Sequence, residues 1–393
     1  MIFKILFYII LIILRIVLIY SSNFKRVIFI KSLENIINGI EHIDFKVCEM
    51  AQDRLNSLAK PLGSLGKLED IARKIAGITG KLNNSIINKR IIIMCADNGV
   101  IEEGVSSCPQ YVTTKQTLNF KKGITGVGAL ALFYNCDLLV VDVGVNSDID
   151  SPNVLNKKIR KSTNNMAKTF AMTYEEAVQA INIGVEMVKK SKDEGFDILG
   201  VGEMGIGNTS TSSAITTVLT GHMVEEVVGK GSGLLERDYI NKINVIKKAI
   251  EINKPNKKDV IDVLSKIGGF DIAAMAGVFL GSAYYKIPVV IDGFISAVAA
   301  LIAVRINPIV KEYLITSHAS KEIGYKIIID ELGLEPMLNL DMRLGEGSGC
   351  PIAFSVVEAS CAVMNNMATF EEADINDDYI DNVRDKSCYI VDR

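Results

Sequence analysis

The stretch DILGVGEMGIGNTSTSSAI, residues Asp197–Ile215, contains three consecutive signals of an α/β fold. Its first part, Asp197–Val201, is a short apolar run typical of a buried strand. Closely spaced glycines follow and indicate a tight turn. The segment Asn208–Ser210 then consists of residue types that favour the first position of a helix. The stretch therefore predicts a strand, a Gly-rich loop and a helix in succession.

Four other short apolar runs are each closely followed by polar residues or glycines. These runs are Arg90–Ala96, Asp137–Val143, Ile287–Ile291 and Tyr313–Thr316. Stretches with helical spacing lie between them, such as Thr173–Glu194 and Asp238–Ile252. Apolar strands alternating with helices predict an α/β fold with a parallel sheet covered on both faces. Ligands of such sheets bind beyond the carboxyl ends of the strands, so we expect the site there.

The composition excludes several function classes. Of 393 residues, 49% are apolar and 23% are charged, which is typical of a globular chain. The net charge of −3 comes without a dense basic run, so nucleic acid is not expected as a partner. The seven cysteines include no C-x-x-C pair, and there are three histidines. A disulfide framework and a metal site are therefore not expected.

The N-terminal residues 1–20, MIFKILFYIILIILRIVLIY, are long and apolar enough to span a bilayer. Lys25, Arg26 and Lys31 follow, so the positive-inside rule would keep the rest of the chain cytoplasmic. An overextended start in AT-rich coding sequence explains the same composition equally well. We expect membrane contact only through residues 1–20. A noncatalytic binding protein tethered by this segment is one alternative function.

A second Gly-rich segment, MRLGEGSGCPIAF at Met342–Phe354, encloses Glu346 between two glycines. A carboxylate among Gly, Ser and apolar residues is poorly hydrated, which raises its pKa and suits a general base near neutral pH. The alternative is a solvated glutamate on a surface turn. His318 follows a predicted strand, and we expect a structural role for it.

Two features of the sequence suggest contacts with phosphate. Gly200, Gly202 and Gly205 satisfy the G-x-G-x-x-G pattern of dinucleotide sites, which gives an NAD-dependent oxidoreductase as an alternative function. Glu203 lies within that pattern and would repel a pyrophosphate. A phosphate or ribose cradle and a ligand-free turn are the other interpretations. Lys242 could meet a phosphate as a point charge, or could lie solvated on a helix.

A third polar segment, Cys95–Phe120, could line a pocket for a flat heterocycle. Taken together, the chain resembles the family of nicotinate-nucleotide–dimethylbenzimidazole phosphoribosyltransferases from about residue 32 to Ala373. The matching stretches are Lys60–Ala72, Cys95–Thr113, Gly123–Val127, Val201–Ser210, Ile240–Ile250, Val263–Gly281, Pro288–Ser296, Ser317–Gly324 and Met342–Gly349. Residues 1–30 fall outside the resemblance.

The resemblance implies a homodimer whose subunits have two domains. The large domain would be a Rossmann-like α/β unit, and the smaller helical domain would be built from both chain ends. We accordingly expect an N-terminal extension at 1–30, a helical part at 31–87, the α/β domain with the active site at 88–350, and C-terminal helices at 351–393.

The implied reaction moves the 5-phosphoribosyl group of nicotinate mononucleotide to 5,6-dimethylbenzimidazole or a related base. The products are α-ribazole 5′-phosphate, used in the nucleotide loop of cobalamin, and nicotinate. Nicotinate leaves as a neutral aromatic ring, so neither a metal nor another cofactor is expected. The incoming base loses a ring proton, which calls for one carboxylate.

The resemblance also implies roles for individual residues. Glu346 would be the general base, and Glu203 a secondary carboxylate. The residues expected to bind the base are Cys108, Gln116, Met204 and Leu344; those expected to bind ribose and phosphate are Gly205, Asn208, Lys242 and Ser320. Cys108 stands where a branch of the family has serine. Because a thiol is a weaker hydrogen-bonding group than a hydroxyl, the preferred base is left open.

Overall fold

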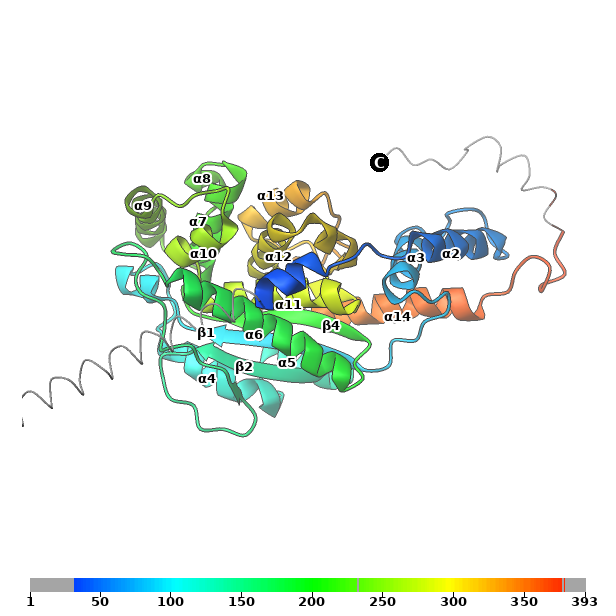
Figure 1. Cartoon of the computed structure of the whole chain (residues 1–393), viewed down its shortest axis with the longest axis horizontal. Helices are drawn as coiled ribbons and strands as arrows, with labels where there is room; N and C mark the ends of the chain where they lie inside the picture. The colour runs from blue at the N-terminus through cyan, green and yellow to red at the C-terminus, as the bar shows by residue number, and fades with distance from the viewer. Residues whose placement is uncertain (1–31, 232, 377, 379–393) are drawn as a thin grey trace, which may run out of the picture.

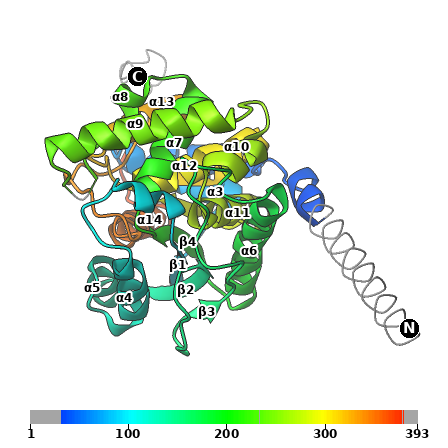
Figure 2. The ribbon, with the colours of Figure 1, turned by 90° about the vertical axis from the view of Figure 1, so that its left-hand side faces the viewer.

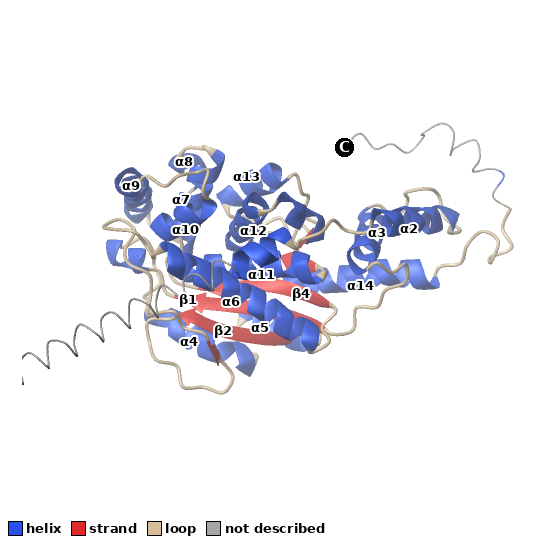
Figure 3. Ribbon diagram, in the orientation of Figure 1, coloured by secondary structure: helices blue, strands red, loops and turns tan. Residues whose placement is uncertain are grey.

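A single parallel sheet organises the chain, as predicted. The structure, a computed structural model, describes residues 32–231, 233–376 and 378. The strands are β1 (Lys89–Ala96), β2 (Asp137–Gly144), β3 (Leu155–Asn156), β4 (Ile198–Met204), β5 (Val289–Ile291) and β6 (Leu314–Thr316). They pair in the order β3-β2-β1-β4-β5-β6, and helices cover both faces of the sheet (Figure 1, Figure 3). The predicted α/β fold class is confirmed.

Helices surround this sheet in the described part of the chain. They include α2 (Phe45–Ser57), α3 (Lys67–Thr79), α4 (Tyr111–Asn119), α5 (Gly126–Phe133), α6 (Tyr174–Asp193), α7 (Asn208–Thr220), α8 (Val224–Val227), α9 (Glu236–Asn253), α10 (Val260–Ile267), α11 (Phe270–Tyr285), α12 (Phe294–Ile306), α13 (Ile323–Leu332) and α14 (Cys350–Asn366). Helices α4 and α5 lie on one side of β1 and β2, with α6 on the other (Figure 2). The two predicted helices correspond to α6 and α9.

Local sequence explains where these elements begin and end. Strand β1 is buried at every residue after Lys89, because both of its faces are covered by helices. Helix α6 begins at a capping box in which the Thr173 hydroxyl accepts from the Glu176 backbone and the Glu176 carboxylate accepts from the Thr173 backbone. Such caps satisfy N–H groups that the first turn of a helix leaves without partners.

Strand β4 is longer than the sequence predicted. It continues to Met204, so Gly202 and Glu203 belong to the strand rather than to a loop. Gly202 pairs with Ile93 of β1. A Cβ atom at Gly202 would lie 2.3 Å from the carbonyl oxygen of Glu346. The glycine therefore allows the loop that carries Glu346 to lie directly on the strand.

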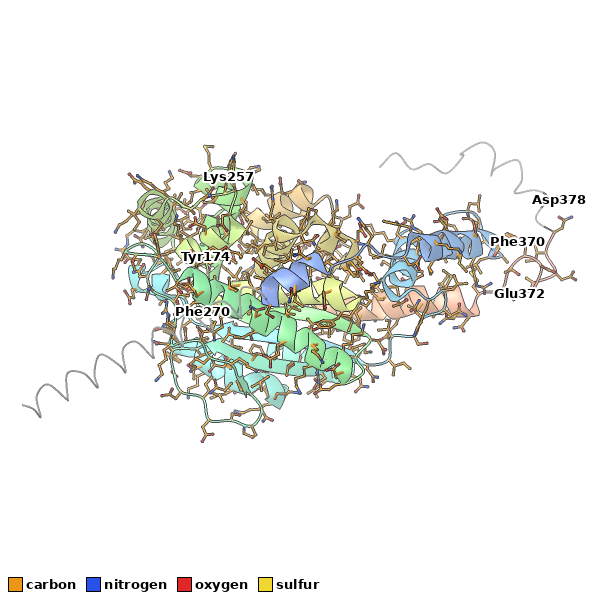
Figure 4. The ribbon with its side chains drawn as sticks, viewed as in Figure 1. Tyr174, Lys257, Phe270, Phe370, Glu372 and Asp378 are labelled. Atoms are coloured by element: carbon orange, nitrogen blue, oxygen red, sulfur yellow. The ribbon has the colours of Figure 1, made fainter. Side chains whose placement is uncertain are left out.

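Helices from both chain ends pack together away from the sheet. Helix α14 begins beside the sheet and extends to α2 and α3 (Figure 1). Their shared apolar cluster consists of Ala51, Leu55, Leu58, Ala72, Ala76 and Met364. The backbone N–H of Phe370 donates to the carbonyl of Ser57, close to the end of this unit (Figure 4).

Residues 32–40 do not belong to this apolar cluster. They place Leu33, Ile36 and Ile40 in the large core. The predicted domain boundaries at 31, 88 and 351 stay a prediction.

The predicted apolar extension at 1–30 lies outside the described residues, as does most of the predicted C-terminal tail. Among the residues that are described, none of the helices is both long enough and apolar enough to cross a bilayer. The apolar helix α12 is too short to span a bilayer and is buried in the core.

Helices α6 and α11 approach each other closely through glycines. A Cβ atom at Gly277 would lie 1.9 Å from the carbonyl oxygen of Ile181, and one at Gly184 would lie 2.0 Å from the carbonyl oxygen of Ala274. Neither contact can be relieved by turning a side chain, because both involve backbone atoms. The two helices must therefore move apart to accept any larger residue.

We expect Gly277→Ala to lower the free energy of unfolding by about 3 kcal/mol, the upper range for overpacking a core. Gly281→Ala on the same helix is the matched control, because its nearest atoms would be 3.0 Å away or farther. Its expected cost is about 1 kcal/mol. Urea unfolding of both variants measures the difference, and equal losses would contradict this account of the helix contact.

Candidate active site

A cavity of about 550 Å³ lies at the carboxyl ends of the strands. The strand order reverses between β1 and β4, which is where open α/β sheets leave a crevice for ligands. The residues that line it follow β1, β4, β5 and β6, and a further group lies just before α14. The cavity therefore lies where the sequence predicted a site.

Glu346 projects into this cavity from a loop with unusual backbone geometry. Gly345, Glu346 and Gly347 have φ angles of 82°, 63° and 88°, so three consecutive residues are left-handed. The Glu346 carboxylate accepts the backbone N–H of Val127 at 3.0 Å and the amide of Gln116 at 3.3 Å. Val127 lies in the first turn of α5, where helix N–H groups favour a negative charge.

Burial decides the protonation behaviour of Glu346. The residue is 6% exposed, which excludes the solvated surface turn that the sequence left open. Burial raises the pKa of the Glu346 carboxyl, while the backbone groups at the start of α5 and the Gln116 amide oppose that rise. The result is a carboxylate of raised basicity at the cavity wall, suited to accepting a proton.

Glu203 lies directly beneath the loop that carries Glu346. One of its oxygens accepts the backbone N–H of Glu346 at 3.2 Å, and the other accepts the Asn208 amide at 2.5 Å. Burial is the main reason that the pKa of Glu203 rises to about 8, and the nearby Asp271 charge adds to the rise. Glu203 is therefore largely protonated at neutral pH.

Two buried carboxylates at this site were missed by the sequence reasoning. Asp271 accepts the Asn208 amide at 3.0 Å, and burial raises its pKa to about 6. Asp292 lines the cavity, and burial raises its pKa to about 7. The position of Asp292 directly after a predicted strand was a signal that could have found it. Asp271 lies in the first turn of α11, where no motif marks it.

Lys242 is buried beside the cavity and is not solvated on a helix surface. It is 1% exposed, and its ammonium donates to the Thr209 hydroxyl at 3.0 Å and to the Gly229 carbonyl at 3.3 Å. Burial lowers the pKa of Lys242 to about 8, and the Glu322 carboxylate opposes that shift. Thr209 lines the cavity at the first turn of α7, so the cation lies one side chain behind the wall.

The structure brings the predicted site residues together. The cavity wall includes Glu203, Glu346, Cys108, Gln116, Met204, Leu344, Gly205, Asn208 and Ser320, whereas Lys242 lies behind Thr209. His318 is buried, its ring contacts the Ser317 hydroxyl at 3.1 Å, and burial lowers its pKa to about 4, so it is a neutral packed residue. Among the described residues, no group of three or more His, Cys, Asp or Glu could hold a metal ion.

The glycines of the dinucleotide pattern have another use. Gly200 lies inside β4, where a Cβ atom would be 2.6 Å from the Cβ atom of Cys350 in α14. Gly202 lets the Glu346 loop pack directly on the same strand. These two glycines are needed for close packing of α14 and the loop on β4, and they do not form a turn around a pyrophosphate. The alternative oxidoreductase is therefore not supported.

Comparison with known proteins gives a consistent result. The sequence profile of a family described as Phosphoribosyltransferase matches residues 40–375. The nicotinate-nucleotide–dimethylbenzimidazole phosphoribosyltransferase of Clostridium perfringens is 56% identical over 359 residues, which cover 91% of this chain and 99% of the relative. Its namesake from Clostridium acetobutylicum is 55% identical over 344 residues, covering 88% and 98%.

A solved structure agrees with the sequence relatives. The crystal structure of nicotinate-nucleotide-dimethylbenzimidazole phosphoribosyltransferase from Thermus thermophilus superposes with a TM-score of 0.80 at 35% identity. The match covers 85% of this chain and 99% of that chain.

The raised pKa of Glu203 predicts how stability depends on pH. The ordinary pKa of this carboxyl is 4.5, and the folded chain raises it to about 8. At this group the folded state therefore binds more protons between these values, so the contribution of Glu203 to the free energy of unfolding falls as pH rises from about 5 to about 8. We expect Glu203→Gln to make this fall shallower, measured by urea unfolding at several pH values.

Glu225→Gln is the control for this experiment. The Lys247 ammonium lowers the pKa of the exposed Glu225 carboxyl, so this group stays ionised throughout the range. The control should therefore leave the pH dependence unchanged. Identical slopes for wild type and Glu203→Gln would show that Glu203 is not protonated in the folded state.

Proposed function

The chain belongs to the Phosphoribosyltransferase family, and from this premise we propose that it transfers the 5-phosphoribosyl group of nicotinate mononucleotide to 5,6-dimethylbenzimidazole or a related base. The products are nicotinate and α-ribazole 5′-phosphate, which supplies the nucleotide loop of cobalamin. The observation that carries the proposal is the buried Glu346 carboxylate at the wall of the cavity.

We propose that Glu346 is the general base of this reaction. A nitrogen of the acceptor base attacks C1′ of the ribose, while the bond from C1′ to the nicotinate nitrogen breaks and its electron pair stays on that nitrogen. The anomeric centre inverts from β to α. Glu346 accepts the ring proton that the acceptor loses, and its raised pKa increases the driving force for this transfer.

Glu203 supports this arrangement from beneath. Its contact with the Glu346 backbone N–H orients the loop, and its contact with Asn208 connects the loop to the start of α7. Because Glu203 is largely protonated at neutral pH, it adds little negative charge beside the base. Glu346, whose carboxylate accepts the Gln116 amide at the cavity wall, is the proton acceptor in this proposal.

The phosphate end of the donor is assigned to the first turn of α7. The N-terminus of this helix favours an anion at Thr209, and Lys242 supplies a positive charge from behind Thr209. Gly205 and Ser320 complete this part of the cavity wall. A phosphate here would stabilise the ammonium form of Lys242 against the effect of its burial.

The acceptor base is assigned to the part of the cavity that Cys108, Gln116, Met204 and Leu344 line. These side chains offer apolar surface for a flat ring and few strong hydrogen-bonding groups. Cys108 contributes only a weak donor and acceptor, which leaves room for a benzimidazole other than the dimethyl form or for a purine.

We also propose that the chain forms a homodimer. The apolar side chains of Ile124, Leu132 and Phe133 are exposed on and beside α5. Leu132 and Phe133 are 72% and 79% exposed, and exposed apolar surface of this kind supports a protein contact there. Light scattering of the full chain should give twice the mass of one chain.

The transferase activity is tested by product formation. Incubation of the full chain with nicotinate mononucleotide and 5,6-dimethylbenzimidazole should give nicotinate and α-ribazole 5′-phosphate in equal amounts, separated by chromatography. If neither this base nor a panel of benzimidazoles and purines yields a nucleotide, the proposed function is wrong.

Glu346→Gln should fold like the wild type, because the amide oxygen can still accept the Val127 N–H. Loss of the base should lower kcat by about 10²- to 10⁴-fold. Glu358→Gln is the control, since this half-exposed residue of α14 pairs with Lys89 and does not line the cavity. Near-normal turnover by Glu346→Gln would remove Glu346 from the mechanism.

A further inference from the structure

The loop that carries Glu346 needs external support for its conformation. Three consecutive left-handed residues are found at 345–347, and the middle one has a side chain. Glycine adopts this conformation readily, whereas glutamate does not. A side chain held this way persists only where surrounding contacts determine it. The contacts that hold the loop therefore control where the Glu346 carboxylate lies.

Asp292 supplies two of these contacts from the end of β5. One carboxylate oxygen accepts the backbone N–H of Gly347 at 3.0 Å, and the other accepts the N–H of Gly349 at 2.7 Å. Asp292 is 2% exposed and follows a strand that is wholly buried, so its own position is fixed.

The same carboxylate also contacts the residue from which α14 begins. Gly349 immediately precedes the first residue of that helix. Its backbone N–H donates to Asp292, so the end of β5 is joined to the start of α14. The loop is thus held at both ends, because Glu203 accepts the N–H of Glu346 while Asp292 accepts those of Gly347 and Gly349.

We propose that Asp292 is a positioning residue for Glu346. Asp292 acts through the backbone that follows Glu346 in the chain. It holds the Glu346 carboxylate against α5 and toward the cavity. This inference rests on the proposed function, in which Glu346 removes a proton from the acceptor base. The ring nitrogen of His318 is 3.9 Å from the Asp292 carboxylate. Because the His318 ring is a neutral packed group, it does not compete with Glu346 for that proton.

Asp292→Asn tests the proposal, because it replaces one acceptor oxygen by a donor that faces a backbone N–H. We expect kcat to fall by about 100-fold, the effect of a small misplacement of a catalytic group. We expect KM for nicotinate mononucleotide to change by less than about threefold, because the loss is in orientation and not in substrate binding.

Asp142→Asn is the matched control. Asp142 is 1% exposed at the end of β2, and its carboxylate accepts the backbone N–H groups of Gly144 and Val145 at 3.1 and 2.9 Å. It also pairs with Lys158 and does not line the cavity. Its substitution should destabilise the protein to a similar degree while kcat stays within about twofold.

Hydrogen exchange gives a readout that does not depend on activity. The amides of Gly347 and Gly349 should exchange faster in Asp292→Asn than in wild type, and should be unchanged in Asp142→Asn. If the wild type forms no nucleotide product, the proposed function fails and the positioning of a general base fails with it, while exchange still shows whether Asp292 holds the loop.

Three outcomes would overturn the proposal. One is unchanged kcat in Asp292→Asn despite faster exchange of the loop amides. Another is a rise in KM with unchanged kcat, which would make Asp292 a substrate contact. The third is an equal fall of kcat in Asp142→Asn. If Asp292→Asn does not fold, Asp292→Glu keeps the charge but displaces it by one methylene, and its kcat should lie below the wild-type value with the same KM.

Discussion

The close contact between β4 and the loop of Glu346 is the constraint on which the site depends. It exists because Gly202 has no side chain, and any Cβ atom there would meet the Glu346 carbonyl at 2.3 Å. Pressed against the strand, the loop places its backbone N–H groups within reach of carboxylates at the ends of β4 and β5. The geometry of the candidate site thus depends on the absence of one side chain in a buried strand.

This arrangement concentrates acidic groups in a small buried volume. Glu203, Asp271, Asp292 and Glu346 all have raised pKa values because burial disfavours their charged forms. Backbone N–H groups and the Asn208 amide offset part of that cost, and partial protonation reduces the repulsion that remains. The carboxylates differ in the N–H donors that they accept from: Glu203 and Asp292 accept from the loop, while Glu346 accepts from the start of α5 and faces the cavity.

Much of this could be predicted from sequence, and the limits have physical causes. Five of the six described strands were predicted because their apolar runs are continuous, whereas the two-residue β3 has no such run and was not predicted. Glu346 was singled out because its Gly, Ser and apolar neighbours leave a carboxylate poorly hydrated. The predicted end of β4 was wrong because Gly202 and Glu203 resemble loop residues until the packing of the Glu346 loop on the strand is known. Asp271 was missed because its partner Asn208 is distant in the chain and only the tertiary fold brings them together.

The cavity has two chemically different ends, and this difference fits a group transfer better than a redox reaction. Lys242 and the first turn of α7 favour an anion at one end, while Gln116 and Glu346 offer a hydrogen-bonding and proton-accepting edge at the other. A sugar phosphate bound at the first end would direct its anomeric carbon toward a base held at the second. In the proposed reaction the leaving ring departs neutral, so only one proton has to move, and one buried carboxylate of raised pKa, which we propose to be Glu346, would be sufficient for that step.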